Sequence, residues 1–281
     1  MVKEFKINKV TNFGKETILK PDNLAIEEPL EIAIKLGNSR EKKSISVTMR
    51  TPENDLELAV GFLFTEGIIY SKNNLNSPVS SGFEENKITI NFAADFNPDL
   101  EKLKRNFYTT SSCGVCGKES IEAIKQVCRI PIKKPDVPVK METLFSLSEK
   151  LLAVQKTFET TGGIHASALF DLEGNILNVR EDVGRHNALD KLIGAELLND
   201  PTENFSLRNR IVLLSGRASF ELIQKCAMAG VPIICAIGAP SSLAVETAEN
   251  FGITLVGFLK NGNANVYCGA DKLDLNSENE N

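Results

Sequence analysis

The sequence predicts an α/β protein, because its C-terminal half alternates short buried strands with amphipathic helices. From residue 163 onward, the expected order is strand, strand, helix, strand, helix, strand, helix, strand. The segments Ile211–Leu214 and Ile233–Ala236 are almost wholly apolar, which is typical of strands that are covered on both faces. We therefore expect a sheet with helices on each side.

Turn and capping residues bound the elements of this half. Glu173-Gly174-Asn175 predicts a turn between the first two strands, and Gly230 ends the second helix. The expected strands are Ala166–Phe170, Ile176–Val179, Ile211–Leu214, Ile233–Ala236 and Ile253–Phe258, and the expected helices are Ala188–Leu198, Ser219–Ala229 and Ser242–Asn250. Before them, apolar residues from Leu144 to Phe158 follow a helical spacing.

Residues 1–110 are expected to form a separate β-rich α+β domain, and residues 111–281 the α/β domain. Alternating residues predict strands over Glu31–Leu36, Ser44–Met49 and Lys87–Phe92, the first two as a hairpin. Thr51-Pro52 is expected to open a helix with Thr51 as its N-cap, and Gly67 to close it.

The bulk composition excludes some classes of function. The chain has a net charge of −5, which disfavours a general binder of nucleic acid or of a membrane surface. No signal peptide is expected behind Met1, and the apolar run Leu58–Phe64 is too short to span a bilayer. We therefore expect a cytoplasmic protein, in which six cysteines do not form a disulfide framework.

The strongest chemical signal is the pair Cys113 and Cys116, separated by Gly114 and Val115. A helix is expected to begin at Lys118, and no acidic residue occurs over residues 109–118. Helix amides and a nearby cation lower a cysteine pKa, and the thiolate is the form that attacks sulfur. The pair is therefore expected to be reactive and accessible.

Three other interpretations of this pair stay open. A structural zinc site needs four ligands, but the other cysteines occur singly, at Cys128, Cys226, Cys235 and Cys268. A thioredoxin-like dithiol would follow the first strand of a small βαβ unit, not a hundred residues of another domain. An inert pair in a turn is the remaining alternative.

A second group of polar residues is expected at the edge of the sheet. Arg185 and Arg217 follow strands and precede or open helices, where arginine and helix amides suit phosphate groups, although a surface salt bridge or a helix cap explains them equally well. His186 lies beside Arg185 and is left open between ligand binding and structure. His165 is expected to be a hydrogen-bonded structural residue. Cys226, Cys235 and Cys128 are expected to be small core residues.

Several motifs in sequence order resemble the formate dehydrogenase accessory sulfurtransferase family (FdhD/NarQ). They extend over nearly the whole chain and are Cys113-Gly-Val-Cys116-Gly117, Thr161–Ala166, Glu181–Lys191, Ser215–Glu221 and Leu255–Lys260, with Pro52–Ile68 also fitting. The resemblance implies a three-layer α/β/α fold similar to that of cytidine deaminases. The matching helix starts here are His186-Asn187-Ala188 and Ser215–Ala218, which lack the glutamate and both cysteine ligands of those enzymes, so deamination is not expected.

The resemblance also implies an activity and a site. Family members carry sulfur from a cysteine desulfurase to the molybdenum cofactor of formate dehydrogenase, in its guanine dinucleotide form (Mo-bis-molybdopterin guanine dinucleotide). Cys113 would hold the persulfide, and Cys116 would assist or relay the sulfur. The family's cofactor-binding loop corresponds to Leu259, Lys260, Asn261, Gly262, Asn263 and Ala264. Many members have arginine at the position of Asn263, so one phosphate contact is expected to be missing here or to be supplied by another residue.

We therefore expect a sulfurtransferase with a cysteine loop and a cofactor pocket that includes Arg185, His186 and Arg217. Its expected partners are a cysteine desulfurase, formate dehydrogenase and a second copy of the chain, with no nucleic acid, membrane or resident metal. The alternative function is a non-catalytic chaperone of the cofactor or the apo-enzyme, in which the cysteine pair only shapes a turn.

Overall fold

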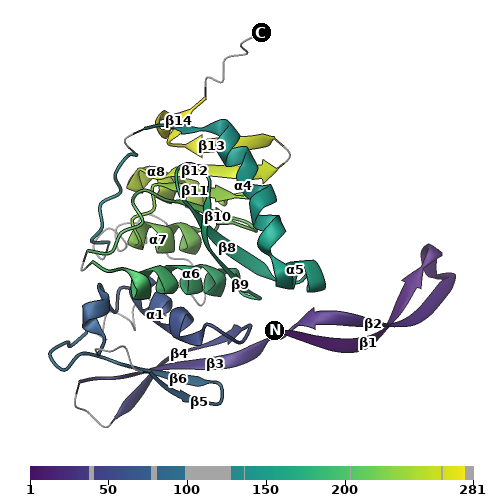
Figure 1. The fold of residues 1–281 in the computed structure, drawn as a ribbon, viewed down its shortest axis with the longest axis horizontal. Helices are drawn as coiled ribbons and strands as arrows, with labels where there is room; N and C mark the ends of the chain where they lie inside the picture. The colour runs from purple at the N-terminus through teal and green to yellow at the C-terminus, as the bar shows by residue number, and fades with distance from the viewer. Residues whose placement is uncertain are drawn as a thin grey trace.

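The computed structural model describes residues 1–37, 41–76, 81–98, 128–135, 137–202, 204–260 and 262–275. Cys113, Cys116, Asn261 and the expected domain boundary at residue 110 lie outside these ranges. The described chain forms a layered α/β body, a smaller sheet beneath it and a long hairpin that extends to one side (Figure 1). None of its helices is both long enough and apolar enough to cross a membrane.

A six-stranded mixed sheet forms the centre of the body, in the order β13-β12-β11-β10-β8-β9. Its strands are β8 (His165–Phe170), β9 (Ile176–Asp182), β10 (Ile211–Leu214), β11 (Ile233–Ala236), β12 (Thr254–Lys260) and β13 (Asn263–Cys268). β10, β11 and β12 are parallel, and β8 runs antiparallel to both β10 and β9. The carboxyl ends of β9, β10, β11 and β12 therefore share one edge of the sheet.

Helices cover both faces of this sheet, which confirms the expected three layers (Figure 1). The helices are α4 (Met141–Val154), α5 (Lys156–Thr161), α6 (Arg185–Asn199), α7 (Phe220–Met228) and α8 (Ser242–Phe251). α4 packs on one face through Leu144, Leu147 and Leu151. α6, α7 and α8 pack on the other face, in a separate apolar cluster. The mixed α/β class predicted from the sequence is confirmed.

The smaller sheet has the order β4-β3-β6-β5 and shares a core with the body. Its elements are β3 (Glu28–Lys35), β4 (Lys42–Arg50), β5 (Ser81–Glu84), β6 (Lys87–Asn91) and the helix α1 (Asp55–Thr65). β3 and β4 form the predicted antiparallel hairpin. Leu30, Ile32 and Ile34 belong to the same buried cluster as α6 and α7, so apolar packing is continuous between the two sheets.

Helices α1 and α6 join the two parts at a close crossing. Gly61 and Gly194 face each other there, and their lack of side chains lets the backbones touch. A Cβ added to Gly61 would lie 1.8 Å from the carbonyl oxygen of Asp190, and one added to Gly194 would lie 1.9 Å from that of Glu57. Both positions therefore require glycine if the helices are to keep this spacing.

Two elements differ from the sequence-based expectation. Thr51 does not cap a helix: α1 begins at Asp55, after Asn54, whose φ of 59° is left-handed. Thr51 instead receives a hydrogen bond from the backbone N–H of Val183, so its hydroxyl joins the connection after β4 to the connection after β9. The helical stripe from Leu144 to Phe158 is divided into α4 and α5 at Gln155.

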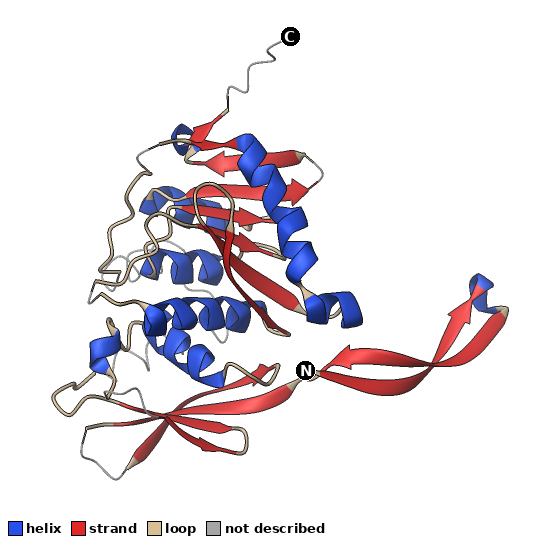
Figure 2. Cartoon of the chain, in the orientation of Figure 1, coloured by secondary structure: helices blue, strands red, loops and turns tan. Residues whose placement is uncertain are grey.

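The hairpin formed by β1 (Val2–Thr11) and β2 (Glu16–Ala25) was not predicted as an element. It extends away from the body (Figure 2). Two short strands, β7 (Val139–Lys140) and β14 (Leu273–Asp274), pair at the opposite end of the molecule.

Candidate functional site

The candidate site lies at the edge where β9, β10, β11 and β12 end. Arg185 is the first residue of α6, directly after β9, as expected. Arg217 lies in the connection from β10 to α7, which begins three residues later at Phe220. Parallel strands that end together bring these connections side by side, which is the usual location of a ligand in an open α/β sheet.

A buried ion pair fixes the connection from β9 to α6. The Nζ of Lys191 lies 2.7 Å from Asp182 Oδ2, and both side chains are at most 1 % exposed. The Asp182 carboxylate also accepts hydrogen bonds from the backbone N–H groups of Thr51 and Gly184 and from the Asn187 side chain. These hydrogen bonds and the ion pair hold the Asp182 carboxylate in place. Because Gly184 and Asn187 are among the donors, they also fix the position at which α6 begins.

Arg185 presents an unsatisfied donor at this fixed position. Its Nε is buried and has no hydrogen-bond partner among the described residues. A buried donor without a partner costs about 1–3 kcal/mol, and more when the group is charged. The N-terminus of α6 adds positive potential at the same point. An anionic ligand that accepted this hydrogen bond would remove that cost.

The side chain of His186 contacts two residues at the start of α7. Its Nε2 lies 3.4 Å from Ser219 Oγ and 3.9 Å from Glu221 Oε2. The contact with His186 lowers the pKa of Glu221 to about 2, against partial burial that acts in the opposite direction. Glu221 is therefore ionised at all physiological pH values, and it orients the imidazole across the gap between α6 and α7.

His165 lies at the start of β8, beside this cluster. An added Cβ on Gly216 would lie 3.3 Å from its Nδ1, so the ring and the Gly216 backbone are in close contact. Burial lowers the pKa of His165, and the charges of Arg185 and His186 lower it further. The hydrogen bond expected of a structural histidine is not found for its ring among the described residues. A neutral imidazole can donate one hydrogen bond and accept another.

This lowered pKa predicts a pH dependence of stability. The unfolded ring gains a proton below its usual pKa of 6.5, whereas the folded ring stays neutral to lower pH. Stability is therefore lost as the pH falls from about 6.5 toward the folded pKa. In His165→Gln, the free energy of unfolding from urea titrations should fall less between pH 7 and pH 5.5 than in the wild type. If the free energy of unfolding changed equally with pH in the wild type and the variant, the lowered pKa of His165 would not be the cause of the pH dependence.

The connections after β10 and β11 are joined by backbone hydrogen bonds. The N–H of Gly238 donates to the carbonyl of Gly216 over 2.9 Å, and that of Ala218 donates to the carbonyl of Ala239 over 3.2 Å. An added Cβ on Gly238 would lie 3.0 Å from the backbone of Arg217, so a larger residue would push the two connections apart. Arg217 is exposed, and its backbone is held by this contact.

The end of β12 continues the edge and carries backbone strain. Phe258 has a φ of 53°, which is costly for a residue with a large side chain, and it lies at a bulge in the pairing with β13. Its N–H donates to the carbonyl of Gly238, which ties β12 to the connection after β11. Strained backbone of this kind persists where the surroundings impose it, and often at binding sites.

The predicted cofactor-binding loop is the turn between β12 and β13. Lys260 pairs with Asn263 across the two strands. Lys260, Gly262 and Asn263 are exposed, and Ala264 is half-buried. Leu259 is fully buried in the core cluster under α4, so only its backbone can reach a ligand. Asn261 lies outside the described residues.

The four described cysteines are poor nucleophiles. Cys226 and Cys235 are fully buried, as predicted, and burial raises the pKa of Cys235 to about 12 and that of Cys226 further. Cys128 and Cys268 are partly buried, with raised pKa values for the same reason. All four therefore remain thiols at neutral pH. Cys113 and Cys116 lie outside the described residues.

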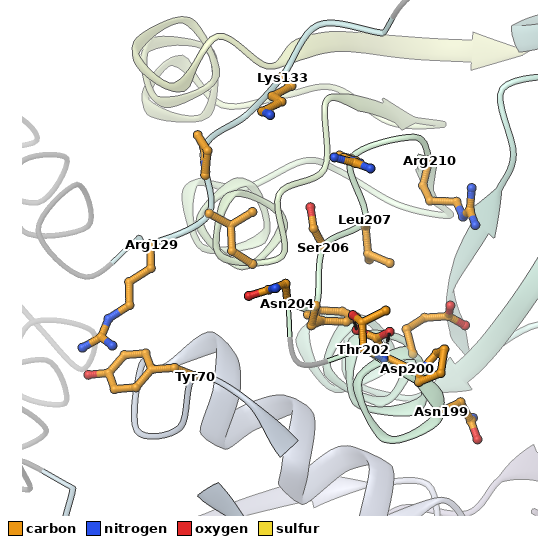
Figure 3. Close-up of a pocket in the computed structure, with 16 residues that line it drawn as sticks. Tyr70, Arg129, Lys133, Asn199, Asp200, Thr202, Asn204, Ser206, Leu207 and Arg210 are labelled. Atoms are coloured by element: carbon orange, nitrogen blue, oxygen red, sulfur yellow. Dashed lines mark hydrogen bonds between the residues drawn. The ribbon is translucent and has the colours of Figure 1, made fainter. Parts of the chain in front are cut away.

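A separate pocket of about 800 Å³ lies at the other end of the sheet, before β10 (Figure 3). Its basic lining residues are Arg129, Lys133, Arg208 and Arg210. The guanidinium of Arg129 lies 3.4 Å from the centre of the Tyr70 ring, a cation–π contact. None of the sequence-predicted site residues lines it.

Sequence reasoning missed three residues of the edge: Ser219, Glu221 and Phe258. The first two stand in the motif Ser215–Glu221, but only the folded chain shows that they meet His186. For Phe258, the preceding Gly257 was the one available signal of a close backbone approach: its added Cβ would lie 2.9 Å from Pro240.

Comparisons with known proteins agree with this architecture. The model of the FdhD/NarQ family matches residues 25–274. Two proteins named sulfur carrier protein FdhD are similar over most of their length. That of Mycolicibacterium paratuberculosis is 47% identical over 92% of this chain and 94% of its own, and that of Streptomyces coelicolor is 46% identical over 91% and 90%.

A crystal structure described as a formate dehydrogenase accessory protein, from Desulfotalea psychrophila, has the same fold. It superposes with a TM-score of 0.73 at 24% identity and covers 97% of this chain and 99% of its own. The family match spans the smaller sheet, the layered body and every motif quoted above. The chain belongs to the FdhD/NarQ family.

Proposed function

We propose that this chain carries sulfur as a persulfide on Cys113 and delivers it to a molybdenum cofactor. The observation that carries the proposal is the distribution of thiol reactivity. Four of the six cysteines have raised pKa values and remain protonated at neutral pH, which leaves Cys113 and Cys116 as candidate acceptors. Relatives at 46–47% identity bear the name sulfur carrier protein, which supports the same role here.

The loading step is a thiol exchange. The Cys113 thiolate attacks the outer sulfur of a persulfide on a cysteine desulfurase, and the sulfur–sulfur bond of the donor breaks. The donor cysteine leaves as a thiolate, and the transferred sulfur remains on Cys113. Cys116 assists this exchange. In the delivery step, the Cys116 thiolate attacks the inner sulfur of the Cys113 persulfide, so that a Cys113–Cys116 disulfide forms and the outer sulfur takes up a proton and leaves as hydrosulfide for the cofactor. Delivery takes place in the cytoplasm, before the cofactor enters formate dehydrogenase, and the working unit is a homodimer.

The cofactor is the cargo, and the edge of the sheet is its proposed site. Its guanine dinucleotide form, Mo-bis-molybdopterin guanine dinucleotide, carries phosphates that would accept the unpaired Arg185 donor. His186 is oriented by Glu221, and the exposed Arg217 and Lys260 add positive charge. The segment from Leu259 to Ala264, which includes Asn261, Gly262 and Asn263, would contact the nucleotide.

Arg185→Met should weaken nucleotide binding. Loss of one charge-assisted hydrogen bond to phosphate corresponds to about 10- to 100-fold in the dissociation constant for guanosine diphosphate. Isothermal titration calorimetry of the purified variant measures this change. The matched control is Arg208→Met, which removes an exposed arginine at the other end of the sheet and should leave the affinity unchanged. Equal losses in both variants would contradict the assignment of Arg185.

Thiol alkylation separates the carrier from a non-catalytic chaperone. At pH 7, iodoacetamide should label Cys113 or Cys116 first, because the four described thiols are protonated and partly or fully buried. Peptide mapping after short exposures identifies the labelled residue. A chaperone with an inert turn would show no cysteine that reacts faster than a free thiol.

A further inference from the structure

The N-terminal arm, formed by β1 and β2 over residues 2–25, belongs to neither hydrophobic core. The two strands pair along ten consecutive positions, from Val2 with Ala25 to Thr11 with Glu16. None of their residues is buried. Figure 1 shows the arm extending away from the body, and its second strand packs near the short helix α5. An isolated two-stranded ribbon is at best marginally stable in water, so we expect another protein surface to pack against the arm.

Large apolar side chains are exposed along the arm. They are Phe5 at 43%, Val10 at 58%, Phe13 at 104%, Ile18 at 56%, Leu19 at 67% and Leu24 at 42% exposure. Successive residues of a strand point to opposite faces, so Ile18 and Leu19 place apolar groups on both sides of the ribbon. A concentration of exposed apolar residues on one element marks an interaction surface.

The body carries its own exposed apolar residues next to the base of the arm. Leu152 and Val154 at the end of α4 are 59% and 42% exposed, and Phe158 on α5 is 37% exposed. We call these three residues the α4–α5 patch. Because α5 packs near β2, the patch and the base of the arm are neighbours on one chain. Two copies related by a two-fold axis can therefore lay each arm along the patch of the other.

The net charge of the arm and the surface area that it could bury are both consistent with binding to a second copy of the chain. Residues 1–25 contain five lysines and three acidic residues, a net charge of +2, whereas the whole chain has −5, so the remainder carries −7. A basic arm is attracted to an acidic body. Ten paired residues make a ribbon about 34 Å long. Covering one face of both arms would bury roughly 1,400 Å² in total, within the range of about 1,200–2,000 Å² typical of stable complexes.

We propose that two copies of this chain exchange their N-terminal arms, each arm covering the α4–α5 patch of the other copy. The proposal rests on the homodimer stated under the proposed function, and it specifies the element that builds it. Residues 2–24 of the arm precede the region matched by the family model.

The double variant Ile18→Lys/Leu19→Lys tests the arm. Both side chains are mostly exposed, so the fold of the monomer should survive, which circular dichroism and thermal melting would verify. Sedimentation equilibrium should show a dimer for the wild type and a dissociation constant raised at least about 100-fold for the variant, since two apolar contacts are each replaced by a charge. The matched control, Val137→Lys/Leu275→Lys, adds the same charge at exposed positions next to β7 and β14 and should remain dimeric.

Photo-crosslinking identifies the surface that receives the arm. The photoreactive residue p-benzoylphenylalanine at position 13 should capture a peptide that contains residues 152–158. Mixing unlabelled chains with heavy-isotope-labelled chains should give crosslinks between the two isotopic forms.

Three results would overturn the proposal. They are a dimer that the arm variant leaves intact, crosslinks confined to one chain, and a monomeric wild type whose arm binds vesicles of phosphatidylcholine and phosphatidylserine instead. Persulfide loading of Cys113, measured separately on the same variants, shows whether the sulfur-carrying function stands in each case.

Discussion

Gly61→Ala is expected to destabilise this protein by about 3 kcal/mol or more, because the added methyl group has no space. Its Cβ would lie 1.8 Å from the carbonyl oxygen of Asp190, and a backbone atom cannot rotate away as a side chain can. The helices α1 and α6 would have to separate, which would open the core that both sheets share. Differential scanning calorimetry should show a melting temperature lower by roughly 6–12 °C.

Two further variants make this prediction specific. Gly194→Ala should cost a similar amount, since it forces the same helices apart from the other side, and the double variant should cost less than the sum of the two. Gly163→Ala is the matched control. Its added Cβ would meet only one atom, 3.8 Å away, so its melting temperature should stay within about 2 °C of the wild type. A Gly61→Ala protein as stable as that control would contradict the close crossing.

Lys191→Met is the second change with a large expected effect, about 3–5 kcal/mol of lost stability. The substitution leaves the carboxylate of Asp182 fully buried without its counter-charge. It also removes the hydrogen bond from Nζ to the carbonyl oxygen of Thr51, which ties the segment before α1 to α6. Urea titration with fluorescence or circular dichroism measures the loss.

The same chain offers a surface pair for comparison. Lys42 lies 2.6 Å from Glu84, but these side chains are 43% and 60% exposed, so Lys42→Met should cost less than about 1 kcal/mol. Adding Asp182→Asn to Lys191→Met should recover part of the loss, because the buried charge is then removed. Similar losses of stability in Lys191→Met and Lys42→Met would contradict a buried ion pair between Lys191 and Asp182.

The order of elements in the α/β body could be predicted because local pattern and burial agree there. Strands such as Ile211–Leu214 are apolar throughout and lie in the middle of the sheet, and the chain order of strands and helices from residue 163 matches the expectation. The helix after Thr51 started later than predicted. The capping preference of Thr51 was outweighed by its tertiary hydrogen bond with Val183, which no local pattern reveals.

The N-terminal arm shows why local pattern can fail. Charged and apolar residues alternate irregularly in residues 2–25, and the ribbon has no buried face that would impose a period of two. Its structure depends on pairing between its own strands and on whatever covers it.

The positions of some residues of the candidate site could be predicted from the sequence, but their contacts could not. Arg185 and His186 were predicted because a helix that follows a strand must begin at the carboxyl edge of the sheet, and the structure places them there. The unsatisfied Nε of Arg185 and the contact of His186 with Glu221 depend on how α6 and α7 pack. Sequence spacing does not contain that information, so these features appear only in three dimensions.

Persulfide loading of single-cysteine variants tests the central claim most directly. The purified protein would be incubated with a cysteine desulfurase and cysteine, and its intact mass measured before and after reduction. The wild type, Cys128→Ala and Cys268→Ala should each gain a reducible sulfur atom, whereas Cys113→Ala should gain none. Unchanged loading of Cys113→Ala, or loading that is lost in Cys128→Ala or Cys268→Ala instead, would contradict the proposed sulfur carrier.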